Sequence, residues 1–224
     1  MKQIHGGPVL DVVPSTGGFV FAAQQDSTED GRAIVEYKTC DFVSRRLENI
    51  TRNLYLLTKF GDLYERYADN PQQYLTSMTA FFPNGDLLLV EADGSVRRMT
   101  QEGCCVYERQ FLYQGSAPAA VAIANGFVWA SYSHPGAVLR YDTRTMREVF
   151  RYGGGSGAAL LGAHGLWFEG DILFVCCKDS GRIVQINLRN FHMEDHHLFT
   201  EPVSVFMKVQ ATEIVWLESG IYKF

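Results

Sequence analysis

Two side chains of this sequence offer chemistry close to the start of a strand-like segment. His164 follows Ala163 at the head of one such segment, and Asp11 interrupts another, Val9–Val13. An imidazole titrates near neutral pH, so His164 is a candidate ligand or general base. Asp11 is a candidate ligand for a cation or a polar molecule. The alternatives are that His164 fills space beside Gly165 and that Asp11 bonds neighbouring backbone, since a buried carboxylate without a partner is costly.

A second group of candidate binding residues is mostly acidic and lies in predicted turns on one face. Turn residues are exposed, so they contact other molecules without disturbing a core. Because acidic residues outnumber basic ones there, we expect a docking partner to present basic residues and salt to weaken the association. A solvated acidic rim without a partner is the alternative. The candidates are Asp26, Glu29, Asp30, Asp93, His134 and Asp179.

The segment His192–His197 holds three imidazoles and two carboxylates. Metal sites use these residue types, but zinc ligands normally come from one helix face or from two separate segments. On an outer strand, the segment is more typical of a solvated edge whose charges discourage pairing between sheets. The sequence contains no Gly-x-Ser-x-Gly and no His-Glu-x-x-His motif. We therefore expect no catalytic residue, no metal site and no cofactor.

Cysteine usage indicates a reducing compartment. The five cysteines are an odd number, and the segment Met1–Pro8 lacks the apolar core of a secretory signal. We expect free thiols, buried and inert, and a cytoplasmic location. The cysteines are Cys40, Cys104, Cys105, Cys176 and Cys177.

Length and charge narrow the class of protein further. The 224 residues carry 20 basic and 25 acidic side chains, a net charge of −5. A chain of this charge has no broad basic surface for nucleic acid or an anionic membrane. No apolar run approaches the roughly 20 residues of a spanning helix. Residues 1–224 are expected to form a single globular domain.

The elements that position the candidate residues follow from a repeat. Each copy has a short apolar run rich in aromatic and β-branched residues, then a turn, then a glycine followed by apolar and polar residues in alternation. Such runs are too short for helices, and glycine supplies the positive φ of a tight hairpin turn. Six copies are recognisable, with glycines at Gly31, Gly61, Gly94, Gly136, Gly181 and Gly220.

Each hairpin has a candidate inner strand before it and, in several copies, a polar fourth strand after it. Four strands per copy, repeated six times, predict an all-β, six-bladed propeller. The last copy ends after three strands, so Met1–His5 is expected to supply the fourth and close the ring. If Leu54–Tyr67 in the short second copy were a helix, the propeller would have five blades. The inner strands are expected to open at Pro8, Val43, Thr76, Pro118, Ala163 and Pro202.

The hairpins Pro83–Arg98 and Gly136–Asp142 resemble those of six-bladed propellers of the NHL and SMP-30/gluconolactonase types. Val138–Asp142 is more distantly similar to WD40 repeats. The resemblance concerns blade architecture and covers most of the chain. Gluconolactonase-like enzymes hold a divalent metal with a Glu, an Asn and an Asp from different blades. No such set is matched here, because the predicted strand openings are mostly apolar.

These patterns favour a non-catalytic propeller scaffold that binds a protein partner. A small metal-dependent hydrolase or lactonase of the SMP-30-like type is the alternative. The choice between them rests on the site, because one fold hosts many functions.

Overall fold

The computed structural model describes residues 1–224 except 16, 28–32, 50–78, 92 and 156–158. Apart from the 3-10 turn η2 (Lys178–Ser180), the regular elements in the described part are β-strands. The predicted all-β class is confirmed there. Among the described residues, no helix has the length and apolar character needed to cross a bilayer. The chain divides into two compact units, unit 1 (Met1–Thr76 with Met207–Phe224) and unit 2 (Ser77–Phe206).

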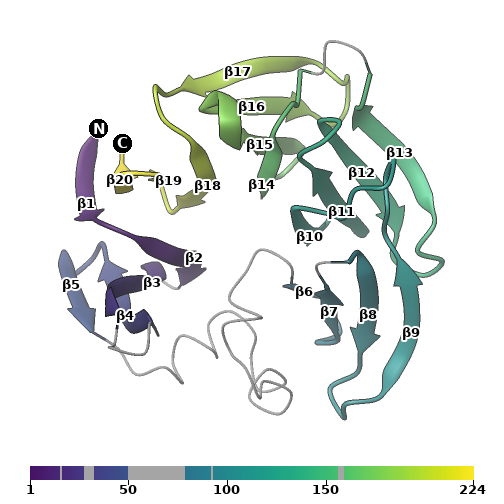
Figure 1. The fold of residues 1–224 in the computed structure, drawn as a ribbon, viewed down its shortest axis with the longest axis horizontal. Helices are drawn as coiled ribbons and strands as arrows, with labels where there is room; N and C mark the ends of the chain where they lie inside the picture. The colour runs from purple at the N-terminus through teal and green to yellow at the C-terminus, as the bar shows by residue number, and fades with distance from the viewer. Residues whose placement is uncertain (16, 28–32, 50–78, 92, 156–158) are drawn as a thin grey trace. The chain divides into compact units, whose positions relative to one another are not determined.

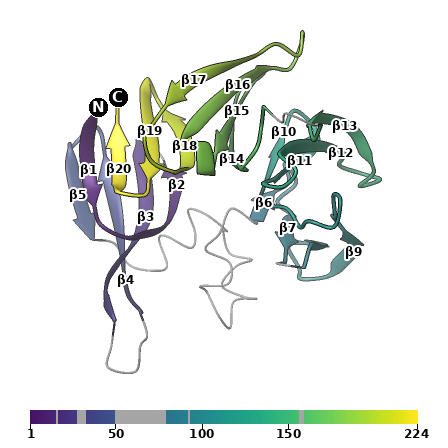
Figure 2. The same ribbon diagram turned by 45° about the horizontal axis from the view of Figure 1, so that its top comes forward.

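Unit 1 contains the sheet β2-β3-β4-β5 and most of a sheet ordered β1-β20-β19-β18, whose strand β18 begins in unit 2 (Figure 1). The hairpin of β3 and β4 extends past its sheet neighbours in Figure 2. The strands are β1 (Lys2–Gly6), β2 (Val9–Ser15), β3 (Gly18–Ser27), β4 (Ala33–Asp41), β5 (Arg46–Asn49), β18 (Val203–Val209), β19 (Thr212–Leu217) and β20 (Gly220–Lys223).

The N-terminal strand completes the last sheet, as predicted. β1 pairs antiparallel with β20 from Lys2 opposite Lys223 to Gly6 opposite Gly220. The two backbones approach closely, since a Cβ on Gly220 would lie 2.1 Å from the carbonyl oxygen of His5. Gly220 also has a φ of 140°, which L side chains rarely adopt. Glycine at this position therefore lets the two ends of the chain pair.

Unit 2 contains three four-stranded sheets, ordered β6-β7-β8-β9, β10-β11-β12-β13 and β14-β15-β16-β17. All neighbouring strands within them are antiparallel, as expected for successive hairpins. The strands are β6 (Thr79–Phe81), β7 (Leu87–Val90), β8 (Ser95–Met99), β9 (Cys105–Gln110), β10 (Ala120–Ala124), β11 (Phe127–Tyr132), β12 (Ala137–Asp142), β13 (Glu148–Gly153), β14 (Ala163–Glu169), β15 (Ile172–Cys177), β16 (Arg182–Asn187) and β17 (Met193–Leu198).

The core of unit 2 lies between successive sheets, because the middle strands bury both faces. On β11, Val128, Ala130 and Tyr132 pack toward the cluster shared with the sheet β6–β9. Trp129 packs on the opposite side, with Tyr152 and residues of the sheet β14–β17. Successive side chains of one strand thus point to opposite faces and contribute to two apolar layers. Burying a large side chain in such a layer contributes about 1.5–3 kcal/mol.

The described residues form five four-stranded blades, not the six that the repeats predict. The hairpin of the second copy, Leu54–Tyr67, falls within residues 50–78, outside the described part of the chain. Val43 also differs from expectation. It lies in the turn between β4 and β5 with 78% of its surface exposed, so it does not open an inner strand. β5 follows it and completes the first blade.

The cysteines are all free, but the expectation of buried thiols is wrong for one pair. Cys40, Cys176 and Cys177 are buried, whereas Cys104 and Cys105 are exposed. The exposed pair spans the turn into β9, the outer strand of its sheet, and an outer strand has no further sheet neighbour to cover it.

Candidate functional site

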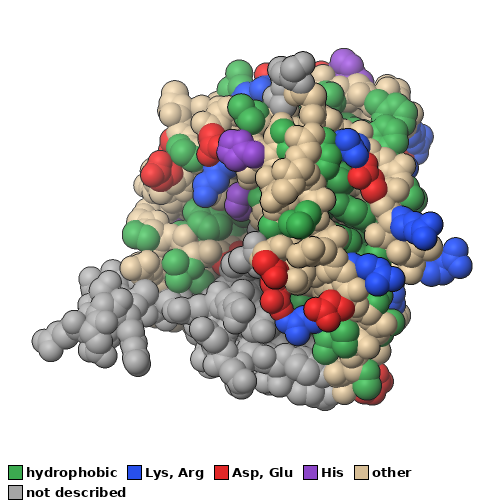
Figure 3. Space-filling model, turned by 45° about the vertical axis from the view of Figure 1, so that its right-hand side comes forward, with side chains coloured by type: hydrophobic (Ala, Val, Ile, Leu, Met, Phe, Trp, Pro, Cys, Tyr) green, Lys and Arg blue, Asp and Glu red, His purple; other side chains and the backbone are tan. Residues whose placement is uncertain are grey.

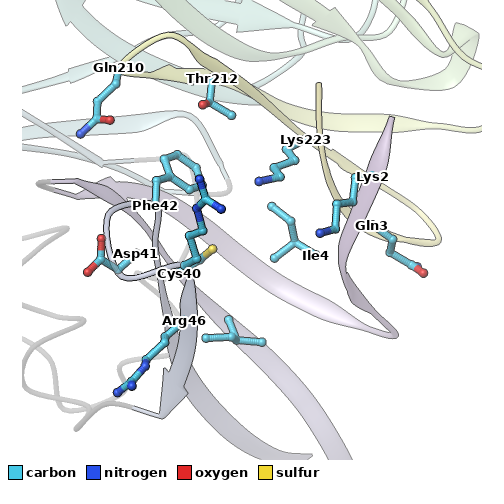
Figure 4. A pocket seen from close by; sticks show the side chains of 12 residues that line it. Lys2, Gln3, Ile4, Cys40, Asp41, Phe42, Arg46, Gln210, Thr212 and Lys223 are labelled. Carbon is cyan, nitrogen blue, oxygen red and sulfur yellow. The ribbon is translucent and has the colours of Figure 1, made fainter.

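Unit 1 contains a half-open pocket of about 570 Å³ between its two sheets (Figure 4). β1 and β20 form one wall, the end of β4 and the turn into β5 form another, and residues around the β18–β19 turn complete it. Its lining side chains are Lys2, Gln3, Ile4, Cys40, Asp41, Phe42, Arg45, Arg46, Leu47, Gln210, Thr212 and Lys223.

Pairing between β1 and β20 places two lysines opposite each other at the pocket wall. Lys2 and Lys223 are direct partners in the antiparallel register, so their side chains leave the same face. Figure 4 shows both ammonium groups pointing toward the space beside Phe42 and Cys40. Neither lysine forms an ion pair with any residue in the described parts of the chain. Like charges directly opposite one another destabilise a strand pair unless something neutralises them.

The turn that follows β4 is fixed by its own acidic residue. The Asp41 carboxylate accepts a hydrogen bond from the backbone N–H of Val43 at 2.8 Å. A hydrogen bond from the Ser44 side chain, together with the Val43 bond, lowers the pKa of Asp41 below its usual value. Arg45 has a positive φ of 57° in this turn. Asp41 is thus occupied in shaping the turn, and the turn carries Arg45 to the pocket.

Aromatic and thiol groups form the apolar side of the pocket. The Phe42 ring lies 5.9 Å from the Lys223 ammonium, a distance at which the ring face attracts a cation. Cys40 is buried, and burial raises the pKa of its thiol, with Lys223 acting in the opposite direction. Cys40 is therefore a neutral, weakly polar wall and not a thiolate at neutral pH.

The pocket is strongly basic, although the chain as a whole is acidic. Four lining residues are cationic and one is a carboxylate. Arg46 lies 3.8 Å from Glu48 and points away from the centre of the pocket in Figure 4. Lys2, Lys223 and Arg45 are left to attract a negatively charged group. Such an arrangement suits a carboxylate or another anion, because fixed cations stabilise the charge that enters.

Asp11, a predicted site residue of unit 1, does not line this pocket. Asp11 is 4% exposed, and its carboxylate accepts a hydrogen bond from the backbone N–H of Val12 at 2.9 Å. Asp26 lies near the end of β3. Glu29 and Asp30 lie outside the described residues. Asp11 therefore bonds neighbouring backbone, which is one of the two roles considered for it.

The predicted turn residues of unit 2 are all exposed. Asp93, His134 and Asp179 occupy the β7–β8, β11–β12 and β15–β16 connections. The Asp93 carboxylate accepts hydrogen bonds from the backbone and hydroxyl of Ser95 at 2.8 and 3.0 Å, and these bonds lower its pKa. Asp93 thus stabilises its own turn. The space-filling view shows acidic and basic side chains together on the visible face (Figure 3).

His164 lies on β14, beside two of these turns. Gly162 connects the two turns, because its N–H donates to the carbonyl of Ser133 and its carbonyl accepts from the backbone N–H of Lys178. His164 is half-buried, and burial followed by the charge of Lys178 lowers the pKa of its imidazole, while Asp179 acts in the opposite direction. The structure thus brings His164 close to Asp179.

A second, apolar pocket of about 330 Å³ lies in unit 2 along three inner strands, β6, β10 and β14. Ala122, Ile123 and Phe168 are among its lining residues. These inner strands therefore form a small, mostly aliphatic surface. Its lining includes the Thr79 hydroxyl and the Trp167 indole N–H, both buried without a hydrogen-bond partner among the described residues, but no charged side chain, in contrast to the basic pocket of unit 1.

Sequence reasoning missed the basic pocket. Lys2 and Lys223 are 221 positions apart, and no local motif joins them. The predicted pairing of the first and last strands was the one signal available, because a strand register specifies which side chains face each other.

No protein-family model matches the chain, and no curated protein matches it in sequence. Solved structures do match its fold. A streptogramin B lyase is 14% identical, with 99% of this chain and 84% of the lyase covered and a TM-score of 0.63. Virginiamycin B lyase from Staphylococcus aureus is 11% identical, with 100% and 86% covered and a TM-score of 0.54. A glutaminyl cyclase from Myxococcus xanthus is 8% identical, with 99% and 94% covered and a TM-score of 0.53. At these identities the likeness concerns architecture alone, and it identifies the chain as an all-β propeller.

Proposed function

We propose that this chain is a non-catalytic propeller that binds a protein partner, and that the basic pocket of unit 1 receives an acidic segment of that partner. The observation that carries the proposal is the facing pair Lys2 and Lys223, which lines the pocket without an ion-pair partner in the described residues. Two cations held opposite each other are stabilised when a carboxylate enters between them.

Apolar surface beside the pocket favours a polypeptide over a small inorganic anion. Val43, in the β4–β5 turn next to the lining residue Phe42, is 78% exposed, and Leu47, a lining residue on β5, is 42% exposed. A free phosphate or sulfate would leave these side chains in water. A segment with carboxylates and an apolar residue would cover them and neutralise the lysines, so it gains both burial and charge complementarity.

The sign of the charge separates this proposal from docking on the acidic turns, which remains a prediction. A partner for the turns would be basic, whereas the pocket selects an acidic one. The turn carboxylate of Asp93 is already hydrogen-bonded within its own turn, so it has less to gain from a partner. Association through either surface weakens with salt.

The test uses a fluorescein-labelled peptide of alternating Glu and Leu residues and measures binding by fluorescence anisotropy at low and high salt. We expect wild-type protein to bind and Lys223→Glu to lose most of the binding. Arg147→Glu is the control, because it makes the same charge change at an exposed turn residue of unit 2. Equal loss in both variants would show that net charge, not the pocket, governs binding.

The control peptide for the same assay is uncharged and alternates Gln and Leu residues. It keeps the apolar side chains and removes the carboxylates. Binding of the neutral peptide as tightly as the acidic one would contradict the role given to the lysines.

A further inference from the structure

A β-bulge in β17, the outer strand of the sheet β14–β17, brings two histidines to one side of that sheet. β17 pairs antiparallel with β16, with Ile183 opposite His197 and Val184 opposite Asp195. His196 is therefore an extra residue: β17 advances by two residues, from Asp195 to His197, where β16 advances by one, from Val184 to Ile183. In a regular strand, His196 and His197 would point to opposite faces. A bulge inserts the extra residue and redirects its side chain.

Ring geometry confirms that the two imidazoles are neighbours. Their centroids lie 4.3 Å apart at an interplanar angle of 60°. One ring nitrogen of His196 lies within 4.8 Å of one of His197. Both side chains are half-buried, whereas the other residues of β17 are exposed. The outer strand thus carries a pair of imidazoles with a common orientation on an otherwise solvated edge.

Phenylalanines hold these rings in place. The His196 ring packs edge-on against Phe174 at 4.9 Å and against Phe206 at 5.5 Å. The His197 ring lies 5.9 Å from Phe199. Phe174 and Phe206 are each 2% exposed, so they form a fixed apolar wall. An apolar shell of this kind restricts ligand side chains and limits solvent around a metal.

We infer that His196 and His197 bind one divalent transition-metal ion, such as Zn²⁺ or Cu²⁺. Imidazole nitrogen is a preferred ligand of these ions. With metal–nitrogen bonds of roughly 2.0–2.1 Å, two ligands of one tetrahedral ion lie ~3.4 Å apart, which small ring rotations reach from the present separation. Two imidazoles leave coordination positions for water. The inference is independent of the basic pocket, and it revises the expectation that this segment is only a solvated edge.

Nearby carboxylates on the same strand are engaged elsewhere. Asp195 accepts two hydrogen bonds from the guanidinium of Arg182, at 2.6 and 2.9 Å. The Glu194 carboxylate accepts a hydrogen bond from Gln185 at 3.2 Å. The imidazole pair is therefore the feature of β17 that specifies the ion, and it selects nitrogen-preferring metals over Ca²⁺ or Mg²⁺.

The experiment titrates ZnCl₂ into metal-free protein by isothermal calorimetry, with His196→Gln, His197→Gln and His192→Gln as variants. His192 is the matched control, because it is a 68%-exposed histidine that lies just before the same strand. We expect one Zn²⁺ per chain, affinity at least about tenfold weaker in each of the first two variants, and no change in the third. MgCl₂ should give no heat of binding.

Two further readouts keep the inference falsifiable if a variant is poorly folded. Far-UV circular dichroism in metal-free buffer compares the folds, and the electron paramagnetic resonance of bound Cu²⁺ counts coordinated nitrogens in unaltered protein. Two imidazole nitrogens support the site. Fewer than two, or a His192→Gln variant that loses as much affinity as the others, would overturn it.

Discussion

Replacing Lys2 with glutamate should stabilise the protein, although it removes a residue of the proposed binding pocket. Lys2 faces Lys223 across the β1–β20 pair, and their Cβ atoms are expected to be about 4.5–5.5 Å apart. With the ammonium groups ~7 Å apart in water, repulsion amounts to roughly 0.6 kcal/mol before screening. Salt at about 0.1 M reduces this by about half. Converting repulsion to attraction of similar size therefore adds about 0.5 kcal/mol to the free energy of unfolding.

The assay is urea unfolding followed by tryptophan fluorescence. With a slope of about 1–3 kcal/mol/M, Lys2→Glu should raise the midpoint by about 0.2–0.5 M at an ionic strength of about 0.1 M. In 1 M NaCl the gain should disappear, because the Debye length falls to about 3 Å. The same variant should lose binding of the acidic peptide. Stability and binding would then move in opposite directions, which general damage to the fold does not produce.

Arg46→Glu is the control for the stability measurement. It makes the same charge change at another lining residue, but Arg46 lies 3.8 Å from Glu48 and opposite Asp41 in the strand register. The reversal places like charges together, so the midpoint should stay or fall. The reasoning is refuted if Lys2→Glu lowers the midpoint, or if its gain is as large in 1 M NaCl as at low salt.

Three further predictions concern the core, pH and the thiols. Trp129→Ala should lower the free energy of unfolding by about 3–5 kcal/mol in urea titrations, because the indole is fully buried; a loss below about 1 kcal/mol would contradict the packing. Burial lowers the pKa of His164 below its usual 6.5, so the unfolded chain takes up a proton that the folded chain resists. Stability should therefore decline as pH falls through about 6.5, and His164→Gln should make that decline smaller in melting curves. Part of the decline should remain in this variant, because burial also lowers the pKa of His5. In native protein, Cys104 and Cys105 should react rapidly with Ellman's reagent while the buried thiols react only on unfolding, and three or more fast thiols would disprove the assignment.

The two surfaces that carry proposals differ in what they select. The pocket of unit 1 presents fixed positive charge beside exposed apolar side chains, whereas β17 presents two imidazoles against phenylalanines. Salt would weaken the proposed binding of an acidic peptide to the first, and a chelator would withdraw the proposed metal ion from the second. Each is testable in the presence of the other, so the failure of one does not affect the other.

Local patterns in the sequence were enough to predict the all-β class and most of the hairpins. Apolar runs followed by Gly94, Gly136, Gly181 and Gly220 became strand pairs, and each of these glycines has the positive φ that the prediction required. Pairing of Met1–His5 with the last hairpin was also predictable, since that copy ended one strand short. These features depend on neighbours within one repeat, where alternation and turn chemistry act directly.

Features that depend on register and burial were not predictable from the sequence. Only the pairing register places Lys2 opposite Lys223, and only an inserted residue in β17 turns His196 to the side of His197. Exposure of Cys104 likewise depends on which strand is outermost. A shift of one residue in register moves a side chain to the opposite face of a sheet at little cost to the local pattern. The sequence therefore determined which strands form, and the tertiary structure decided which side chains meet.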